Sequence, residues 1–197
     1  MAWRRLESIM VGVLFLSGAA FLLKMCYLSL IFNTVFGVIF LGCVYFYARW
    51  RFGQKLPISL LLLVFAALHV DALGNYFSLY GTWVGPIQYD EFSHLTIQIL
   101  VTPMIVWIVQ KALETRGYQV SGLSSFLAAT TIFSLAALYE VIELWDELYF
   151  GGQRIWSKYD TATDLQWDLL GILIGVALSN LVMRARITVA KPAPHQA

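Results

Sequence analysis

Three pairs of ionisable residues are spaced so that a helix would place both members of each pair on one face. Residues three or four apart are neighbours on the surface of an α-helix, and these pairs have separations of four, three and four residues. A histidine close to several carboxylates can bind a divalent metal ion or exchange protons. The pairs are Asp90 with His94, Glu140 with Glu143, and Asp164 with Asp168.

The chain around these pairs is strongly apolar. Of its 197 residues, 59% are hydrophobic and 13% are charged, about half the charged share of an ordinary soluble domain. Several uncharged runs can be extended to the roughly 20 residues that span a bilayer. We therefore expect an all-α, polytopic transmembrane bundle of about six helices, near residues 6–23, 27–48, 57–76, 91–110, 123–147 and 164–183.

The sequence indicates one domain. It has no internal repeat and no low-complexity linker, so residues 1–190 are expected to form a single transmembrane domain. Residues 191–197 include two prolines and are expected to form a disordered tail. The net charge of +1 lacks the basic surplus of a nucleic-acid-binding protein, so no nucleic-acid partner is expected.

The basic residues predict the orientation. Lysine and arginine favour cytoplasmic loops, and with the N-terminus inside only Lys24, Arg154 and Lys158 fall outside. This topology places the protein in the inner (plasma) membrane with both termini cytoplasmic. The other Lys and Arg residues fall inside: Arg4, Arg5, Arg49, Arg51, Lys55, Lys111, Arg116, Arg184, Arg186 and Lys191.

The acidic residues show the opposite bias. Only Glu7 and Glu114 of the twelve fall on the inner side. Acidic residues contribute little to topology, so their segregation needs another cause. Five of them are also typical of solvated loops or helix ends, which the helix dipole favours near N-termini; these are Asp90, Glu91, Asp146, Glu147 and Asp160.

The three pairs are expected to meet at the outer face. The fifth expected helix runs outward while the fourth and sixth run inward, which gives all three pairs a similar depth. Crowded carboxylates repel one another unless they share a proton or bind a cation. One histidine among carboxylates suits Mg, Mn, Fe or Zn. We expect metal ligands among Asp90, His94, Glu140 and Asp164, with Glu143 and Asp168 as catalytic residues.

A second polar group ends the third expected helix. His69, Asp71 and Asn75 fall on the same outer side. A hydrogen-bonded network and a ligand role are both open for them.

The motifs at these positions resemble a known family. Tyr89-Asp90-x-x-x-His94, Tyr139-Glu140-x-x-Glu143 and Asp164-Leu-Gln-Trp-Asp168-Leu are similar, in order and spacing, to motifs of the YjdF-like bacterial inner-membrane proteins. A more distant similarity is to the VanZ-like family. The first resemblance implies a multi-pass helical membrane protein, and the second implies an association with the cell envelope and glycopeptide resistance. Glu91 stands where the first family commonly has arginine.

Three function classes remain open. The leading hypothesis is a membrane protein with an outward-facing acidic and histidine pocket that binds or acts on an amphipathic envelope molecule, such as a lipid or envelope precursor, with a divalent metal. A metal-bound water could then be the nucleophile. The alternatives are a proton-coupled or cation-coupled transporter and a structural membrane subunit.

The predicted topology can be tested with reporter fusions. A fusion in the loop at residue 50 and a fusion at the C-terminus should both report a cytoplasmic location, because basic residues lie near both positions. If either fusion reports the outer side, the predicted topology is wrong, and so is the placement of the acidic residues on the outer face.

Overall fold

The computed structural model describes residues 30–118, 121–152, 155 and 157–189. Helices make up most of this part of the chain, and two short strands form a hairpin before α4. A π-helical segment, η1, continues α5 directly. The elements are α2 (Leu30–Phe52), α3 (Ile58–Tyr76), β1 (Trp83–Val84), β2 (Ile87–Gln88), α4 (Tyr89–Glu114), α5 (Ser121–Trp145), η1 (Asp146–Phe150) and α6 (Asp160–Val189).

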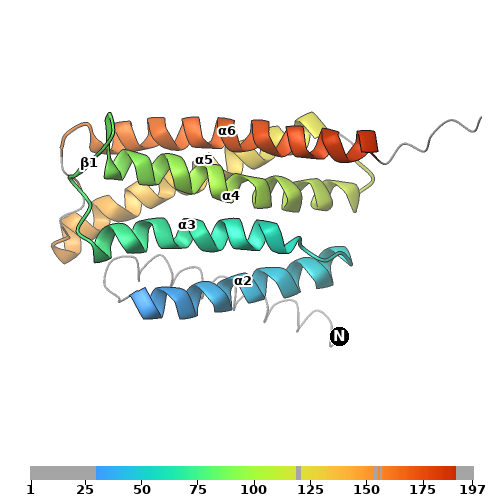
Figure 1. Cartoon of the computed structure of the whole chain (residues 1–197), viewed down its shortest axis with the longest axis horizontal. Coiled ribbons are helices and arrows are strands. Elements are labelled where there is room, and N and C mark those ends of the chain that lie inside the picture. Colours follow the sequence, from blue (N-terminus) through green and yellow to red (C-terminus); the bar gives the residue numbers. More distant parts are fainter. Residues whose placement is uncertain (1–29, 119–120, 153–154, 156, 190–197) are drawn as a thin grey trace, which may run out of the picture.

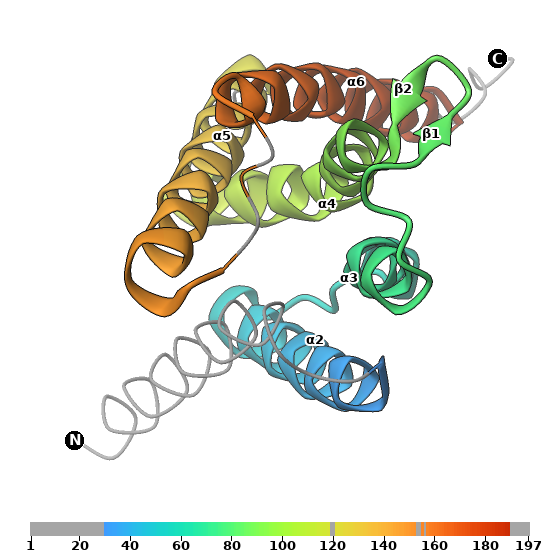
Figure 2. The same ribbon diagram turned by 90° about the vertical axis from the view of Figure 1, so that its left-hand side faces the viewer.

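The helices lie side by side and run alternately in opposite directions (Figure 1). Seen end-on, α4, α5 and α6 form one group, and α3 lies beside α4 with α2 beyond it (Figure 2). The most extensive contact in the bundle joins α4 to α6. The last turns of α3 and α5 and the first turns of α4 and α6 therefore share one end of the bundle. We call it the hairpin end, because β1 and β2 lie there.

Four helical segments of the described chain are long and apolar enough to cross a membrane. They correspond to the expected spans at 57–76, 91–110, 123–147 and 164–183, and are Ile58–Tyr76, Tyr89–Glu114, Gly122–Phe150 and Asp160–Val182. Helix α2 overlaps the expected span at 27–48. The expected total of about six is not confirmed, since residues 6–23 and the turn before residue 27 lie outside the described residues, as does the tail at 191–197.

The boundaries of α3 and α4 follow from local chemistry. Pro57 precedes α3, where its missing N–H costs nothing and its carbonyl accepts from the Leu60 amide at 3.0 Å. Glu91, in the first turn of α4, accepts a hydrogen bond from the Gln88 amide at 2.9 Å. This contact starts α4 at Tyr89, two residues before the expected start. Glu91 is thus a helix-capping residue.

The close contact between α4 and α6 depends on two glycines. A Cβ atom on Gly171 would lie 2.5 Å from the Leu95 carbonyl oxygen, and one on Gly175 would lie 2.6 Å from the Thr102 Cβ. Real Cβ atoms do not approach other atoms so closely. The absence of a side chain at both positions therefore lets the two backbones approach one another, as in many membrane helix pairs.

A separate apolar cluster fills the bundle between α2, α3 and α4. Leu41, Val64 and Met104 are buried in it, with Phe52 packed edge-on against Trp107 at a centroid distance of 6.2 Å. This cluster holds the first half of the described chain against α4.

Adding a methyl group at Gly171 should destabilise the bundle. Gly171→Ala forces the methyl against the Leu95 backbone, which cannot move as a side chain can, so we expect a loss of about 1–3 kcal/mol. Gly42→Ala is the matched control, because nothing lies within 4 Å of a Cβ there and alanine favours a helix by up to about 1 kcal/mol. Thermal unfolding in detergent measures both. Equal melting temperatures for the two variants would contradict the close α4–α6 contact.

Candidate functional site

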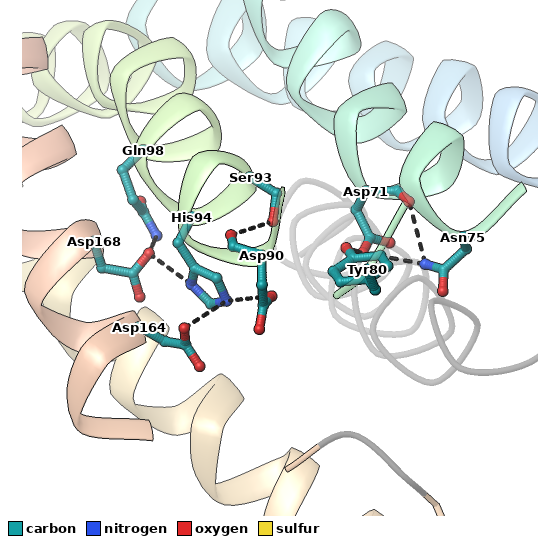
Figure 3. Close-up of polar contacts among 9 residues, drawn as sticks. All are labelled: Asp71, Asn75, Tyr80, Asp90, Ser93, His94, Gln98, Asp164 and Asp168. Carbon is teal, nitrogen blue, oxygen red and sulfur yellow. Dashed lines mark hydrogen bonds and ion pairs between the residues drawn. The ribbon is translucent and has the colours of Figure 1, made fainter. Parts of the chain in front are cut away.

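Helix α4 presents Asp90, His94 and Gln98 at intervals of one turn. Because each is four residues from the next, the three side chains lie on one face. Asp90 is in the first turn of the helix, where a carboxylate also benefits from the helix dipole. This face is turned toward α6 (Figure 3). Helix α4 therefore supplies a carboxylate, an imidazole and an amide to the same place.

Helix α6 faces these residues with Asp164 and Asp168. The two aspartates are one turn apart and buried, with 3% and 1% of their surface exposed. Asp168 is one turn before Gly171, where the two backbones come closest. The glycine contact thus brings Asp168 against α4 and shields its carboxylate from solvent.

The two nitrogens of His94 face different partners (Figure 3). Its Nδ1 lies 3.1 Å from Asp168 Oδ1, which is within hydrogen-bonding distance. Its Nε2 lies 3.7 Å from Asp90 Oδ1 and 4.0 Å from Asp164 Oδ1, both too far for a hydrogen bond. The imidazole is therefore hydrogen-bonded to a carboxylate at Nδ1, whereas the carboxylates nearest to Nε2 lie beyond hydrogen-bonding distance.

Asp168 accepts a second hydrogen bond. Gln98 donates from Nε2 to the same Oδ1 atom at 2.9 Å. Gln98 was not identified from the sequence as a site residue, although its position one turn after His94 was a usable signal. Two donors thus converge on one buried carboxylate oxygen.

Glu140 reaches the same region from α5. Only 4% of its surface is exposed, and Thr161 of α6 donates a side-chain hydrogen bond to its carboxylate. Its Oε1 atom, however, is buried without a hydrogen-bond partner among the described residues. A buried acceptor without a partner costs about 1–3 kcal/mol, and more when it is charged. This oxygen therefore suggests that a further group belongs beside it.

The described residues contain two groups that could hold a metal ion. One is Asp90, His94 and Asp164, and the other is His94, Glu140 and Asp168. Within each group the candidate ligand atoms lie within 4.8 Å of one another. Every residue expected as a metal ligand is in one of the groups, and His94 is in both.

Glu143 is in neither group. It is half-buried and interacts electrostatically with Asp90 and Glu140. Its position is thus at the edge of the cluster, and its catalytic role stays a prediction. Asp168 is at the centre of the cluster, where it contacts His94 directly.

The acidic residues expected at solvated helix ends have different surroundings. Asp146 is buried, with 8% exposed, so the expectation of a solvated charge was wrong for it. Glu147 accepts a hydrogen bond from the Ile155 amide at 3.0 Å. Both belong to η1, and sequence periodicity did not predict that the helix widens there.

The end of α3 carries the second polar group. Asp71 is buried and accepts hydrogen bonds at Oδ1 from the Tyr80 hydroxyl and from Asn75 Nδ2. Burial and the neighbouring Asp71 carboxylate raise the pKa of Tyr80, so its phenol stays protonated and donates. The Tyr89 hydroxyl donates to the Val70 carbonyl. These contacts favour a network that ties the hairpin to α3 over a ligand group.

His69 is separate from that network. Its Nδ1 lies 2.8 Å from the Phe65 carbonyl oxygen and its Nε2 lies 3.0 Å from Thr34 Oγ1. Both ring nitrogens therefore have partners within the bundle. This histidine joins α2 to α3, and among the described residues it belongs to neither of the two groups that could hold a metal.

Fold and site together define a helical membrane protein with a histidine and carboxylate cluster at one end of its bundle. The chain belongs to the family described as predicted membrane protein (DUF2238), whose model matches residues 6–187. The YjdF-like resemblance is consistent with this family, whereas the VanZ-like resemblance is not shown. No curated protein and no solved structure matches the chain.

Removal of Asp168, which accepts hydrogen bonds from both His94 and Gln98, should destabilise the protein more than neutralisation of Glu140, whose Oε1 has no described partner. Asp168→Ala leaves the His94 and Gln98 donors without their acceptor, so we expect a loss of about 2–4 kcal/mol. Glu140→Gln removes a charge whose Oε1 has no described partner, so we expect a change within about 1 kcal/mol. Chemical unfolding of metal-free protein in detergent compares them. An equal loss in both variants would contradict this description of the site.

Proposed function

We propose that this protein binds a divalent metal ion at the hairpin end and uses it on an amphipathic molecule of the cell envelope. The observation that carries the proposal is the position of His94. Carboxylates from α4, α5 and α6 surround its ring, and one of them has a buried oxygen without a described partner.

The charges of the cluster support a bound cation. No lysine or arginine among the described residues forms an ion pair with Asp90, Glu140, Asp164 or Asp168. Lys111, which does pair with an acid, contacts Glu114 at the opposite end of α4. An unpaired charge away from water is costly, and buried charges are usually paired or coordinated to a metal. A divalent ion would offset the mutual repulsion of these carboxylates.

The donor set limits the kind of ion. One imidazole nitrogen with carboxylate oxygens suits Mg, Mn, Fe or Zn better than a soft ion such as Cu(I). The helices that carry these donors are packed closely at Gly171 and Gly175, so the ligands come from rigid elements. The ion would serve either to bind a substrate oxygen or to lower the pKa of a bound water.

The surroundings of the site favour an amphipathic ligand. Large exposed aromatic side chains border the hairpin end, including Trp83 in β1 and Tyr149 and Phe150 in η1, which are 67%, 73% and 76% exposed. Aromatic residues are enriched where a membrane meets water. A molecule that reaches the cluster at this depth would have a polar headgroup beside the site and an apolar part in lipid. The bias of the basic residues favours an orientation with this end on the outer face of the plasma membrane.

A metal assay tests the proposal. Protein purified without a polyhistidine tag or chelator should carry near-stoichiometric Mg, Mn, Fe or Zn by elemental analysis. His94→Ala and Asp164→Asn should lose most of it, because each removes a ligand. Glu114→Gln is the control, since it neutralises an acid of α4 at the opposite end of the helix.

The opposite result has a defined meaning. If wild-type protein contains no metal, and none of the four ions raises its melting temperature, the metal proposal is wrong. A cluster that shares protons would then explain the buried acids better, and proton-coupled transport would become the leading function. Metal retained in both site variants but lost in Glu114→Gln would place the ion elsewhere.

A further inference from the structure

Both groups that could hold a metal include His94, so the ion could be bound at either nitrogen of its ring. A neutral imidazole has one N–H group and one nitrogen lone pair, so a single ring nitrogen is available to a metal. The other nitrogen usually donates to a carboxylate or carbonyl that orients the ring. The contacts of His94 differ enough between its two sides to decide between them.

The Nδ1 side has the geometry of a hydrogen bond. Asp168 Oδ1 lies 3.1 Å from Nδ1 and also accepts from Gln98 at 2.9 Å. An ionised carboxylate only accepts hydrogen bonds, and each of its oxygens has two lone pairs, so Oδ1 can accept from both donors. Nδ1 is therefore expected to carry the proton, which leaves the lone pair on Nε2.

The distances from Nε2 to two aspartate oxygens are close to the distance between two ligands of one metal ion. Asp90 Oδ1 and Asp164 Oδ1 are 3.7 and 4.0 Å from Nε2. Two ligands of one tetrahedral zinc ion, each about 2.0–2.2 Å from it, lie about 3.3–3.6 Å apart. Both separations exceed hydrogen-bonding distance and are within about 0.7 Å of this ligand spacing. An ion bound between these three atoms would draw the two carboxylates toward the ring by about a few tenths of an ångström.

We propose that the metal ion is bound by His94 Nε2, Asp90 and Asp164, and that Asp168 and Gln98 are positioning residues that hold the ring through Nδ1. This inference rests on the proposed function and specifies its site. Glu140 then lies outside the ligand set, although it is near both Asp164 and Asp168. Its carboxylate, whose Oε1 has no hydrogen-bond partner among the described residues, could accept a hydrogen bond from a water bound to the ion.

The alternative site has a specific cost. Coordination by His94 Nδ1, Glu140 and Asp168 would break the hydrogen bond between His94 and Asp168. It would also leave an N–H on Nε2 facing two carboxylates that lie beyond hydrogen-bonding distance. The alternative thus breaks a contact that the fold already makes, and the proposed site keeps it.

The nitrogen that binds metal can be identified by NMR. Protein labelled with ¹⁵N-histidine in detergent is titrated with ¹¹³Cd, and the His94 signals are assigned by their loss in His94→Ala. We expect ¹¹³Cd–¹⁵N coupling on Nε2, with Nδ1 still protonated. Coupling on Nδ1 would overturn this inference and leave the metal function intact. If the protein binds no cadmium and none of the other metals, the proposed function fails as well.

Variants provide a second measurement. Gln98→Met keeps the side-chain length but removes a donor to Asp168, so zinc affinity should fall by about 10–100-fold, the usual effect of losing an orienting contact. Gln110→Met is the matched control, because it removes the donor to Glu114 on the same helix. In Gln98→Met the NMR spectrum should also show the second His94 tautomer, which a purely structural defect would not produce.

Substitutions of the acidic residues distinguish the two candidate metal sites. Asp164→Asn should remove the cadmium coupling, whereas Glu140→Gln should retain it on Nε2. Loss of coupling in Glu140→Gln with retention in Asp164→Asn would assign the ion to the other group and overturn the inference.

Discussion

The close contact between α4 and α6 is the constraint on which the rest of the site depends. Gly171 and Gly175 allow the two backbones to approach until a single added carbon atom would overlap Leu95 or Thr102. Asp168, one turn before Gly171, is thereby placed against His94 and Gln98. In a membrane there is little hydrophobic drive to bring helices together, so this packing and the polar contacts across it must supply the association.

Much of this arrangement follows from spacing in the sequence. Pairs at three or four residues predicted which side chains share a helical face, and alternating helix directions predicted that the pairs meet at one end. The groups around His94 agree with that expectation. The boundaries of α3 were likewise readable from Pro57 and the apolar run after it. These features are local, and local periodicity is the strongest signal that a single sequence carries.

Other features depend on contacts between distant residues and were not predicted. The role of Gln98 depends on a partner 70 positions away on another helix. The hairpin is held by Tyr80 and Tyr89, whose hydroxyls reach α3. Asp146 is buried at the start of a π-helical segment, which no simple periodicity describes. Each of these depends on how elements pack, and packing can override local preference.

The position of the tight contact beside the cluster has a physical reason. An imidazole can rotate about its χ torsions and exchange the proton between its nitrogens, so a ligand histidine needs an acceptor that is itself immobile. Asp168 is 1% exposed, and its Oδ1 atom accepts hydrogen bonds from both the His94 ring and Gln98. A looser pair of helices would admit water to this oxygen and weaken both contacts, because water competes for the same hydrogen bonds. The glycines of α6 therefore hold that helix close enough to α4 for a carboxylate to fix the ring of His94, which the proposed metal site requires.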